Sequence, residues 1–176
     1  MAAGPDAAGG DESALVVAAQ GGDRAAFAEL YQRYGRMVRG ILISSVGIGD
    51  ADDVLQEVFM TAMQQLTSLR DPLAFGGWLA TIARNKGVDH LRRRPVQMEL
   101  PDDLAGASTD QSEALAVLAA IRSLPAAYRE TLTLRLIEGM TGPEIASRTG
   151  LTEGSVRVNL HRGMQQLRAR LGGGLT

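Results

Sequence analysis

The chain has 176 residues, of which 45% are hydrophobic and only 4% aromatic, and its formal net charge is −2. It has no cysteine, which excludes disulfides, thiolate metal sites and a cysteine nucleophile. Its two histidines lie far apart in the sequence, which disfavours a histidine-rich metal site. No apolar run reaches the roughly 18 residues of a membrane helix. Together with an N-terminus that lacks the features of a signal peptide, this predicts a cytoplasmic, mainly helical protein without a metal or another cofactor.

The small net charge hides a strong separation of charge along the chain. Residues 24–95 and 114–176 are basic, with net charges of +3 and +4, whereas residues 1–23 and 96–113 contain acids and no base. This alternation predicts two helical domains joined by an acidic linker. The predicted parts are a disordered N-terminus at 1–12, a first domain at 13–95, a flexible linker at 96–112, a second domain at 113–171 and a tail at 172–176.

The first domain is expected to open with two helices. Ser13 is a suitable cap for a short helix that runs through Ala19, and Asp23 starts the next helix, which Gly47 and Gly49 end. Apolar residues recur along this second helix at helical spacing and predict its core-facing side. They are Phe27, Leu30, Tyr31, Tyr34, Val38, Ile41 and Leu42.

A third helix is predicted to start at Asp50, with Asp53 at a position typical of a capping box. Its apolar side includes Val54, Val58 and Phe59. Its outer side is acidic with a methionine in the middle, and consists of Asp53, Gln56, Glu57, Met60 and Gln64. Two interpretations fit this side: a solvated helix face, or a surface for docking another protein, since methionine ringed by polar groups suits an interface.

A fourth helix is predicted after Asp71-Pro72, and its buried side is expected to change partway along. The first half buries Phe75, Trp78, Leu79 and Ile82 on one side. In the second half, that side carries Asn85, Lys86, Asp89 and Arg93, while Val88 and Leu91 lie opposite. The basic end, Arg92 to Arg94, complements the helix dipole and also suits contacts with phosphates and bases.

In the second domain, helices are expected at about 113–123 and 125–138, followed by a helix-turn-helix. Thr141 caps a short helix, Gly150 ends it, and Thr152 caps a longer helix. Val156, Leu160, Met164, Leu167 and Leu171 form the buried stripe of the longer helix. Its polar, basic N-terminal half predicts DNA binding, although an ordinary helical hairpin with a solvated face shows the same pattern.

Three stretches together resemble one protein family. DADDVLQEVF (50–59), FGGWLATIARNKGVDHLRRR (75–94) and the region 124–171 are similar to the two domains of bacterial sigma factors, in particular the extracytoplasmic-function (ECF) class. The resemblance covers roughly residues 13–171 and implies an all-α protein that directs RNA polymerase to promoters. It also implies that the chain is not an enzyme.

The resemblance implies a role for each surface. The outer side of the third helix would bind the clamp helices of the polymerase β′ subunit through Asp53, Gln56, Glu57 and Met60. The loop at 66–72 and the fourth helix would read and open the −10 element, with Arg84, Asn85, Lys86, Asp89, Arg92 and Arg93 as candidates. Because the aromatic residues of this region fall in its apolar stripe, a pocket in the loop is favoured over an aromatic wedge for capturing an unpaired base.

The second helix of the helix-turn-helix would read the −35 element. The candidates are Ser155, Arg157, Val158, Asn159 and Arg162. ECF sequences often have Ser and Arg at the positions of Val158 and Asn159, so one phosphate or guanine contact is in doubt, while Asn159 could pair with adenine and Val158 could contact a thymine methyl group.

The implied partners are core RNA polymerase, through its β′ and β subunits, promoter DNA, and a separate anti-sigma protein. The alternative function is a stand-alone helix-turn-helix regulator, which would leave the 50–94 region without a role. An enzyme is disfavoured because no nucleophile and base occur at a recognisable spacing.

Overall fold

The computed structural model of the protein describes residues 5–93 and 109–172. Within those two ranges all regular structure is helical, as predicted. Residues 1–4, 94–108 and 173–176 lie outside the described residues, and these include Arg94, the predicted linker up to residue 108 and most of the predicted tail.

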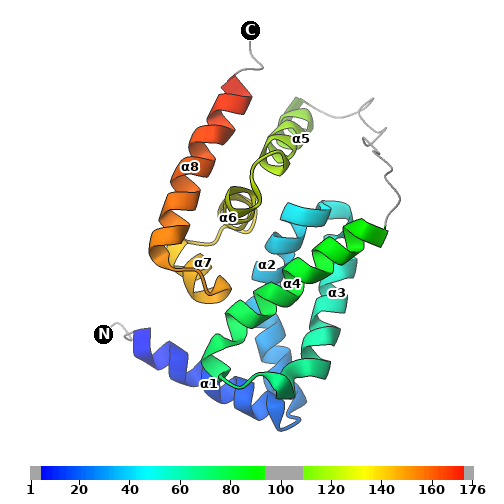
Figure 1. Ribbon diagram of the computed structural model, residues 1–176, viewed down its shortest axis with the longest axis vertical. Helices are drawn as coiled ribbons and strands as arrows, with labels where there is room; N and C mark the ends of the chain where they lie inside the picture. Colours follow the sequence, from blue (N-terminus) through cyan, green and yellow to red (C-terminus); the bar gives the residue numbers. More distant parts are fainter. Residues whose placement is uncertain (1–4, 94–108, 173–176) are drawn as a thin grey trace.

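The first domain consists of four helices and two short 3-10 helices. They are α1 (Pro5–Gln20), α2 (Arg24–Val46), α3 (Ile48–Gln65), η1 (Leu66–Ser68), η2 (Pro72–Ala74) and α4 (Phe75–Arg93). Helices α2, α3 and α4 pack on one another, and α1 lies across one end of this group, against α2 and η2 (Figure 1). Helix α1 therefore contacts both the core of the domain and the loop that contains η1 and η2.

Local signals place the ends of α2 as predicted. Asp23 accepts hydrogen bonds from the backbone N–H groups of Ala25 and Ala26 and so caps the helix. Gly47 ends it with a φ of +92°, a conformation that favours glycine. Five residues of the predicted apolar side of α2 are buried, at most 1% exposed: Leu30, Tyr34, Val38, Ile41 and Leu42. Phe27 is half-buried, and the prediction was wrong for Tyr31, which is 40% exposed although its ring lies 4.4 Å from that of Phe59.

Two helix starts differ from the sequence-based prediction. Helix α1 begins at Pro5 and contains Ser13 in its interior, so residues 5–12, which were expected to be disordered, are helical. Proline in the first turn has a backbone angle suited to a helix start, and Glu12 accepts a hydrogen bond from the hydroxyl group of Tyr34. Helix α3 begins at Ile48, which places Asp50 in its first turn instead of at the cap.

The second domain consists of α5 (Thr109–Arg122), α6 (Ala126–Leu136), α7 (Gly142–Thr149) and α8 (Glu153–Gly172). Helix α5 begins before the predicted start at about residue 113, so it includes the last residues of the predicted linker. Helix α7 has a complete capping box between Thr141 and Glu144, and Gly150 ends it in the left-handed conformation with a φ of +75°. Both features confirm the predicted helix-turn-helix.

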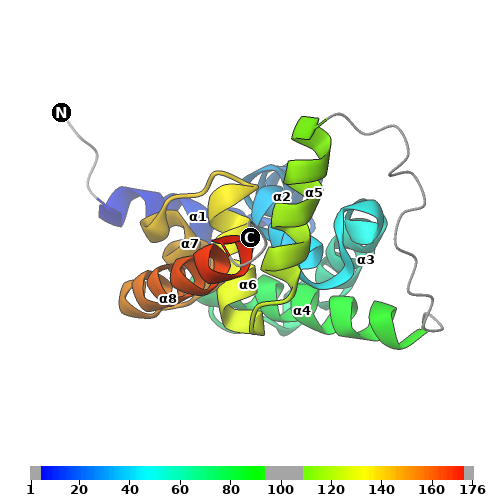
Figure 2. The same cartoon turned by 90° about the horizontal axis from the view of Figure 1, so that it is seen from above.

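The two hydrophobic cores do not coincide with the two domains. One core joins Ile121, Leu124, Leu132 and Leu167 of the second domain. The larger core combines the buried residues of the first domain with Leu134, Met140, Ile145, Ala146 and Val156 of α6, α7, α8 and their connections. The domains therefore pack directly on each other, as both views of the molecule show (Figures 1 and 2).

Glycines make this close packing of the domains possible. A Cβ atom at Gly76 of α4 would collide with the backbone carbonyl oxygen of Arg148 of α7. A Cβ atom at Gly40 of α2 would lie 2.6 Å from Leu134 Cδ2 of α6, closer than carbon atoms approach. Any larger residue at Gly76 would force the two helices apart, because its neighbour there is backbone.

Candidate nucleic-acid and protein interfaces

The outer side of α3 forms an exposed surface, as the sequence indicates. Asp53, Gln56, Glu57 and Met60 are all exposed, with Met60 exposed at 60%. The structure adds Met63, at 59%, which the sequence analysis did not single out. These five residues are called the α3 surface below. Two largely exposed methionines among polar side chains are the pattern expected of a docking surface.

Helix α4 does not change its buried side, and that prediction was wrong. The buried side of its first half, which includes Leu79 and Ala83, continues to Gly87. At Gly87 the helix lies so close to α2 that a Cβ atom would be 2.6 Å from Ser45 Oγ. Val88 and Leu91 are consequently exposed at 44% and 47% instead of becoming the new core side, because no helix within residues 5–93 and 109–172 covers them.

The predicted −10 residues differ in the exposure of their side chains to solvent. Asn85, Arg92 and Arg93 are exposed near the end of α4, whereas Lys86 and Asp89 are half-buried. The ammonium group of Lys86 lies 4.0 Å from Glu57 Oε2, so this lysine links α4 to the α3 surface. The side chains of these three residues are open to solvent, whereas those of Lys86 and Asp89 are partly covered.

Arg84, also a predicted −10 residue, is engaged by the second domain. Its Nε lies 2.9 Å from Glu130 Oε2 and its Nη2 lies 2.7 Å from Glu130 Oε1, a bidentate pair with α6. Hydrogen bonding to Glu130 raises the pKa of Arg84, against the opposite effect of burial. The guanidinium group is therefore not available to a phosphate in this arrangement.

The loop between α3 and α4 buries two of its three leucines. Leu66 and Leu69 are buried, at 2% and 9% exposure, while Leu73 is 70% exposed and Arg70 is exposed as well. Phe75 is fully buried against Tyr34, and Trp78 is partly buried on the same core. The aromatic residues of this region are thus core residues, as predicted, while a base pocket in the loop stays a prediction.

The second helix of the helix-turn-helix, α8, presents its predicted polar side to solvent. Ser155, Arg157, Val158 and Arg162 are exposed, and Asn159 is half-buried. The opposite side holds the helix in place through Val156 and Leu167, which are 1% and 3% exposed. A hollow of about 310 Å³ between α7 and α8 is lined by Gly142, Pro143, Glu153, Val156, Arg157 and Leu160.

Two arginines make further polar contacts between the domains. Arg148 of α7 donates a hydrogen bond to the carbonyl oxygen of Arg33 at 2.8 Å, and its guanidinium carbon lies 4.8 Å from the centre of the Tyr34 ring. Arg39 Nη1 lies 3.0 Å from Glu138 Oε1, whose side chain is 8% exposed. Sequence reasoning missed these partners, because residues about a hundred positions apart show no local pattern.

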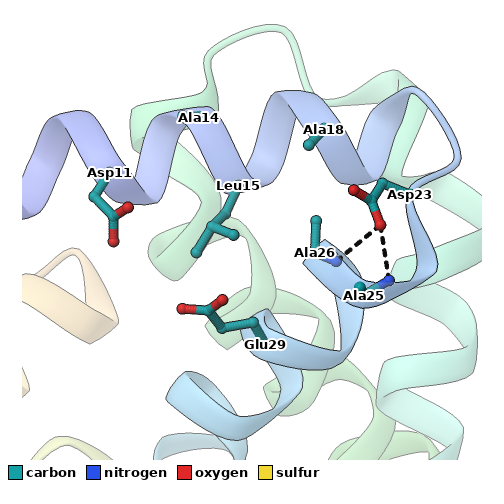
Figure 3. A pocket seen from close by; sticks show the side chains of 8 residues that line it. All are labelled: Asp11, Ala14, Leu15, Ala18, Asp23, Ala25, Ala26 and Glu29. Atoms are coloured by element: carbon teal, nitrogen blue, oxygen red, sulfur yellow. Dashed lines mark hydrogen bonds between the residues drawn. The ribbon is translucent and has the colours of Figure 1, made fainter.

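A second hollow, of about 340 Å³, lies between α1 and α2 and is lined by alanines and acids (Figure 3). Its carboxylates have structural roles. Asp23 caps α2, as the dashed lines in Figure 3 show, and Asp11 lies 2.7 Å from Arg33. The hollow contains none of the residues predicted to bind DNA or polymerase.

The described part of the chain contains no cluster of metal-ligating residues. None of its helices is long and apolar enough to cross a membrane.

Comparison with protein-family models matches both domains in order. Residues 30–95 match "Sigma-70 region 2", and residues 114–167 match "Sigma-70, region 4". These matches include the α3 surface, helix α4 and the helix-turn-helix. Helix α1 lies outside both.

Similar proteins cover most of the chain. The ECF RNA polymerase sigma factor SigF of Caulobacter vibrioides is 30% identical over 165 residues, which are 90% of this chain and 92% of that protein. The ECF RNA polymerase sigma factor RpoE of Cereibacter sphaeroides is 33% identical over 160 residues, 85% and 88% of the two chains.

Solved structures show the same fold. CnrH, solved in complex with the cytosolic domain of CnrY, superposes with a TM-score of 0.65 at 28% identity and covers 92% of this chain and 97% of its own. The sigma factor RpoE of Bartonella quintana, solved with the anti-sigma factor NepR, superposes with a TM-score of 0.52 at 21% identity, covering 82% and 97%.

Proposed function

The chain belongs to the ECF class of RNA polymerase sigma factors and directs promoter-specific transcription, and we propose that it does so through three separate surfaces. One binds core polymerase, one opens the −10 element and one reads the −35 element. The single observation that carries this proposal is the exposure of all three predicted surfaces on a helical scaffold that matches the family in both domains.

The α3 surface binds core RNA polymerase in this proposal. Its exposed acids suit a basic partner. Met60 and Met63 supply exposed apolar area, which the rest of the described chain leaves largely uncovered. The β′ clamp helices are the partner that the family implies, and the β subunit would be contacted by the second domain. Because its proposed partners, core polymerase and promoter DNA, are in the cytoplasm, the protein acts there in this proposal.

Helix α4 and the loop before it open and read the −10 element. Asn85, Arg92 and Arg93 are exposed donors near the basic end of α4, where they can contact phosphates and base edges. Lys86 and Asp89 are half-buried and belong to the same proposed DNA-binding face of α4. Arg84 joins this set only after it leaves Glu130.

Helix α8 reads the −35 element in the major groove. The groove admits an α-helix, and the exposed N-terminal half of α8 presents Arg157, Val158 and Arg162 from a capped start. Ser155 accepts a hydrogen bond from the hydroxyl group of Thr152 at 2.8 Å, so its own hydroxyl hydrogen is free for a phosphate. Asn159 is half-buried on the same half of α8, and in this proposal its side chain contacts a base.

The packed arrangement of the domains must open before both DNA elements are bound. Elements centred about 25 base pairs apart are separated by roughly 85 Å of duplex at 3.4 Å per base pair. A chain in which Arg84 of α4 contacts Glu130 of the second domain is too compact to span that distance. The packed form is thus a resting form.

A separate anti-sigma protein is the partner proposed to stabilise this resting form. The similar protein CnrH was solved in complex with the cytosolic domain of CnrY. A partner that binds across both domains would keep Arg84 and Glu130 together and would cover the α3 surface. The same partner would prevent binding to polymerase without changing the fold of either domain.

Transcription in vitro tests the proposed function. The purified chain, added to core RNA polymerase and a genomic promoter library, should produce run-off transcripts with defined start sites, and these transcripts should share sequences near −10 and −35. Core polymerase alone is the control. If the chain yields no defined transcript from any promoter, or does not bind core polymerase, the proposal is wrong.

A further inference from the structure

The loop between α3 and α4 is held at two points by a residue from α1. The side-chain amide nitrogen of Gln20 donates hydrogen bonds to the carbonyl oxygen of Leu66 at 3.0 Å and to that of Leu69 at 2.7 Å. An amide group has two N–H donors, so Gln20 uses both of them on this loop. Leu69 lies just after η1, in an extended conformation, where no helical hydrogen bond is available to its carbonyl group.

Helix α1 is itself fixed to the body of the domain. Val16 is fully buried in the larger core, and Glu12 accepts a hydrogen bond from the buried Tyr34. The helix ends at Gln20, and Gly22 has a φ of +94°, which turns the chain sharply into α2. Gln20 is therefore presented from a rigid support, although α1 lies outside both matched family regions.

The loop held in this way presents two complementary side chains to solvent. Leu69 points into the core, whereas Arg70 next to it is exposed and Leu73 is 70% exposed. Asp71 accepts a hydrogen bond from the N–H group of Leu73 at 3.0 Å and so caps η2, which begins with Pro72. The cationic side chain of Arg70 and the exposed apolar side chain of Leu73 thus project from the loop. Hydrogen bonds from Gln20 and to Asp71 hold the backbone of this loop.

An apolar side chain beside an arginine suits an unpaired nucleotide. Leucine can contact the face of an unstacked base, and a guanidinium group can pair with the neighbouring phosphate. Capturing such a nucleotide with a mobile loop would add the cost of ordering the loop, whereas a loop that is already ordered avoids that cost.

We propose that Gln20 is a positioning residue for −10 recognition, which holds the loop so that Leu73 contacts the base and Arg70 the phosphate of an unpaired nucleotide. The proposal rests on the proposed function, since it concerns the step in which the −10 element is opened. It assigns a role in promoter choice to α1. Gln20 acts through the loop and does not itself touch DNA.

The test compares promoter discrimination in full-length variants. Gln20→Glu keeps the size of the side chain but replaces the donor amide with a carboxylate, which repels both carbonyl groups. Gln32→Glu makes the same chemical change at an exposed position of α2 and is the matched control. Run-off transcription is measured on the preferred promoter and on templates with single substitutions in the −10 element.

Gln20→Glu should reduce the ratio between the preferred and the substituted promoters roughly tenfold, the factor that one to two hydrogen bonds represent. Affinity for core polymerase should not change, and amide hydrogen exchange at Leu69 should become faster. A merely structural role would lower transcription from all templates equally and leave the ratio unchanged. That result, or an equal loss of discrimination in Gln32→Glu, would overturn the proposal.

The exposed loop residues provide a second test that does not depend on the stability of the Gln20 variant. Leu73→Ala should reduce the same −10 discrimination, and adding Gln20→Glu to Leu73→Ala should cause little further loss. Arg70→Ala should instead lower transcription from all templates about equally, because a phosphate contact carries no sequence information. If Leu73→Ala does not change discrimination, the proposal is wrong even when Gln20→Glu has an effect. If the wild-type chain gives no transcript at all, the proposed function itself fails.

Discussion

The guanidinium group of Arg84 forms a bidentate pair with the carboxylate of Glu130, at 2.9 and 2.7 Å, and so joins the helix predicted to bind the −10 element to the second domain. The side chain of Glu130 is only 13% exposed, whereas that of Arg84 is 37% exposed. The same arginine cannot pair with this carboxylate and with a DNA phosphate at once. If Arg84 contacts the −10 element as proposed, closure of the domains and DNA binding compete for this side chain.

A double-mutant cycle should measure this pair. Arg84→Ala and Glu130→Ala should each lower the free energy of unfolding, and the double variant should lose about 1–2 kcal/mol less than the sum of the two, because the charged hydrogen bonds are lost only once. Urea unfolding of the full chain is the measurement. Additive losses would show that the two side chains do not interact in solution.

The glycine contact between α4 and α7 gives a steric test of the packed arrangement. Gly76→Ala places a methyl group against the carbonyl oxygen of Arg148 and should separate the domains. The matched control is Gly77→Ala, whose Cβ would lie 3.6 Å from Gly150 Cα, an ordinary contact. Small-angle scattering should give a radius of gyration of about 16 Å for the wild type and the control, and a value several ångströms larger for Gly76→Ala. Equal values would contradict the contact.

The α3 surface can be tested with a charge in its apolar part. Met60→Glu should lower affinity for core polymerase by at least roughly thirtyfold, the effect of about 2 kcal/mol at a central interface residue. Val17→Glu makes the same change at an α1 residue of similar exposure, 54% against 60%, and should leave that affinity unchanged. Binding is measured by titrating labelled protein with core polymerase. Equal affinities of the two variants would exclude Met60 from the interface.

The basic residues of α8 should separate into DNA-contacting and structural groups. Arg162→Ala should weaken binding to all −35 sequences and reduce the slope of log affinity against log salt concentration by about one, as expected for the loss of one phosphate contact. Arg168→Ala, exposed in the C-terminal half of the same helix, is the control. An unchanged salt slope for Arg162→Ala would remove this residue from the interface.

The capping box of α7 should make the stability of the protein depend on pH. Hydrogen bonds from the backbone N–H and the hydroxyl of Thr141 lower the pKa of Glu144 below its ordinary value of 4.5. This stabilisation is therefore complete above the ordinary pKa and is lost as the pH falls through the lower pKa of the folded state. Thermal unfolding of wild type and Glu144→Gln between about pH 3 and 7 should show a stability difference that shrinks on acidification. Parallel curves would contradict this.

Sequence patterns were sufficient for features that depend on neighbouring residues. The caps at Asp23 and Thr141 and the glycine end at Gly150 involve residues within four positions of one another, and all three were predicted correctly. The capping box predicted at Asp50 and Asp53 was wrong, because α3 already begins at Ile48. The exposed sides of α3 and α8 were also predicted, because helical periodicity alone places a residue on a side of its helix.

Predictions failed where packing against a distant element decided the outcome. The second half of α4 has apolar residues on its outer side, and periodicity alone suggested that the core side moves to Val88 and Leu91. The structure keeps the core side at Gly87, because only glycine allows α4 to approach Ser45 of α2 so closely. Helix α1 extends back to Pro5, and its contact between Glu12 and Tyr34 also lies between distant positions.

The sequence by itself determined the helical class, the caps at Asp23 and Thr141, the exposed sides of α3 and α8 and, through two matching regions in the right order, the family. Only the tertiary structure decided that Arg84 is engaged by Glu130, that α7 joins the core of the first domain, and that Gln20 holds the loop before α4. The reason is physical: periodicity and capping act over a few residues, whereas these contacts join residues 46 or more positions apart and form only when the helices pack.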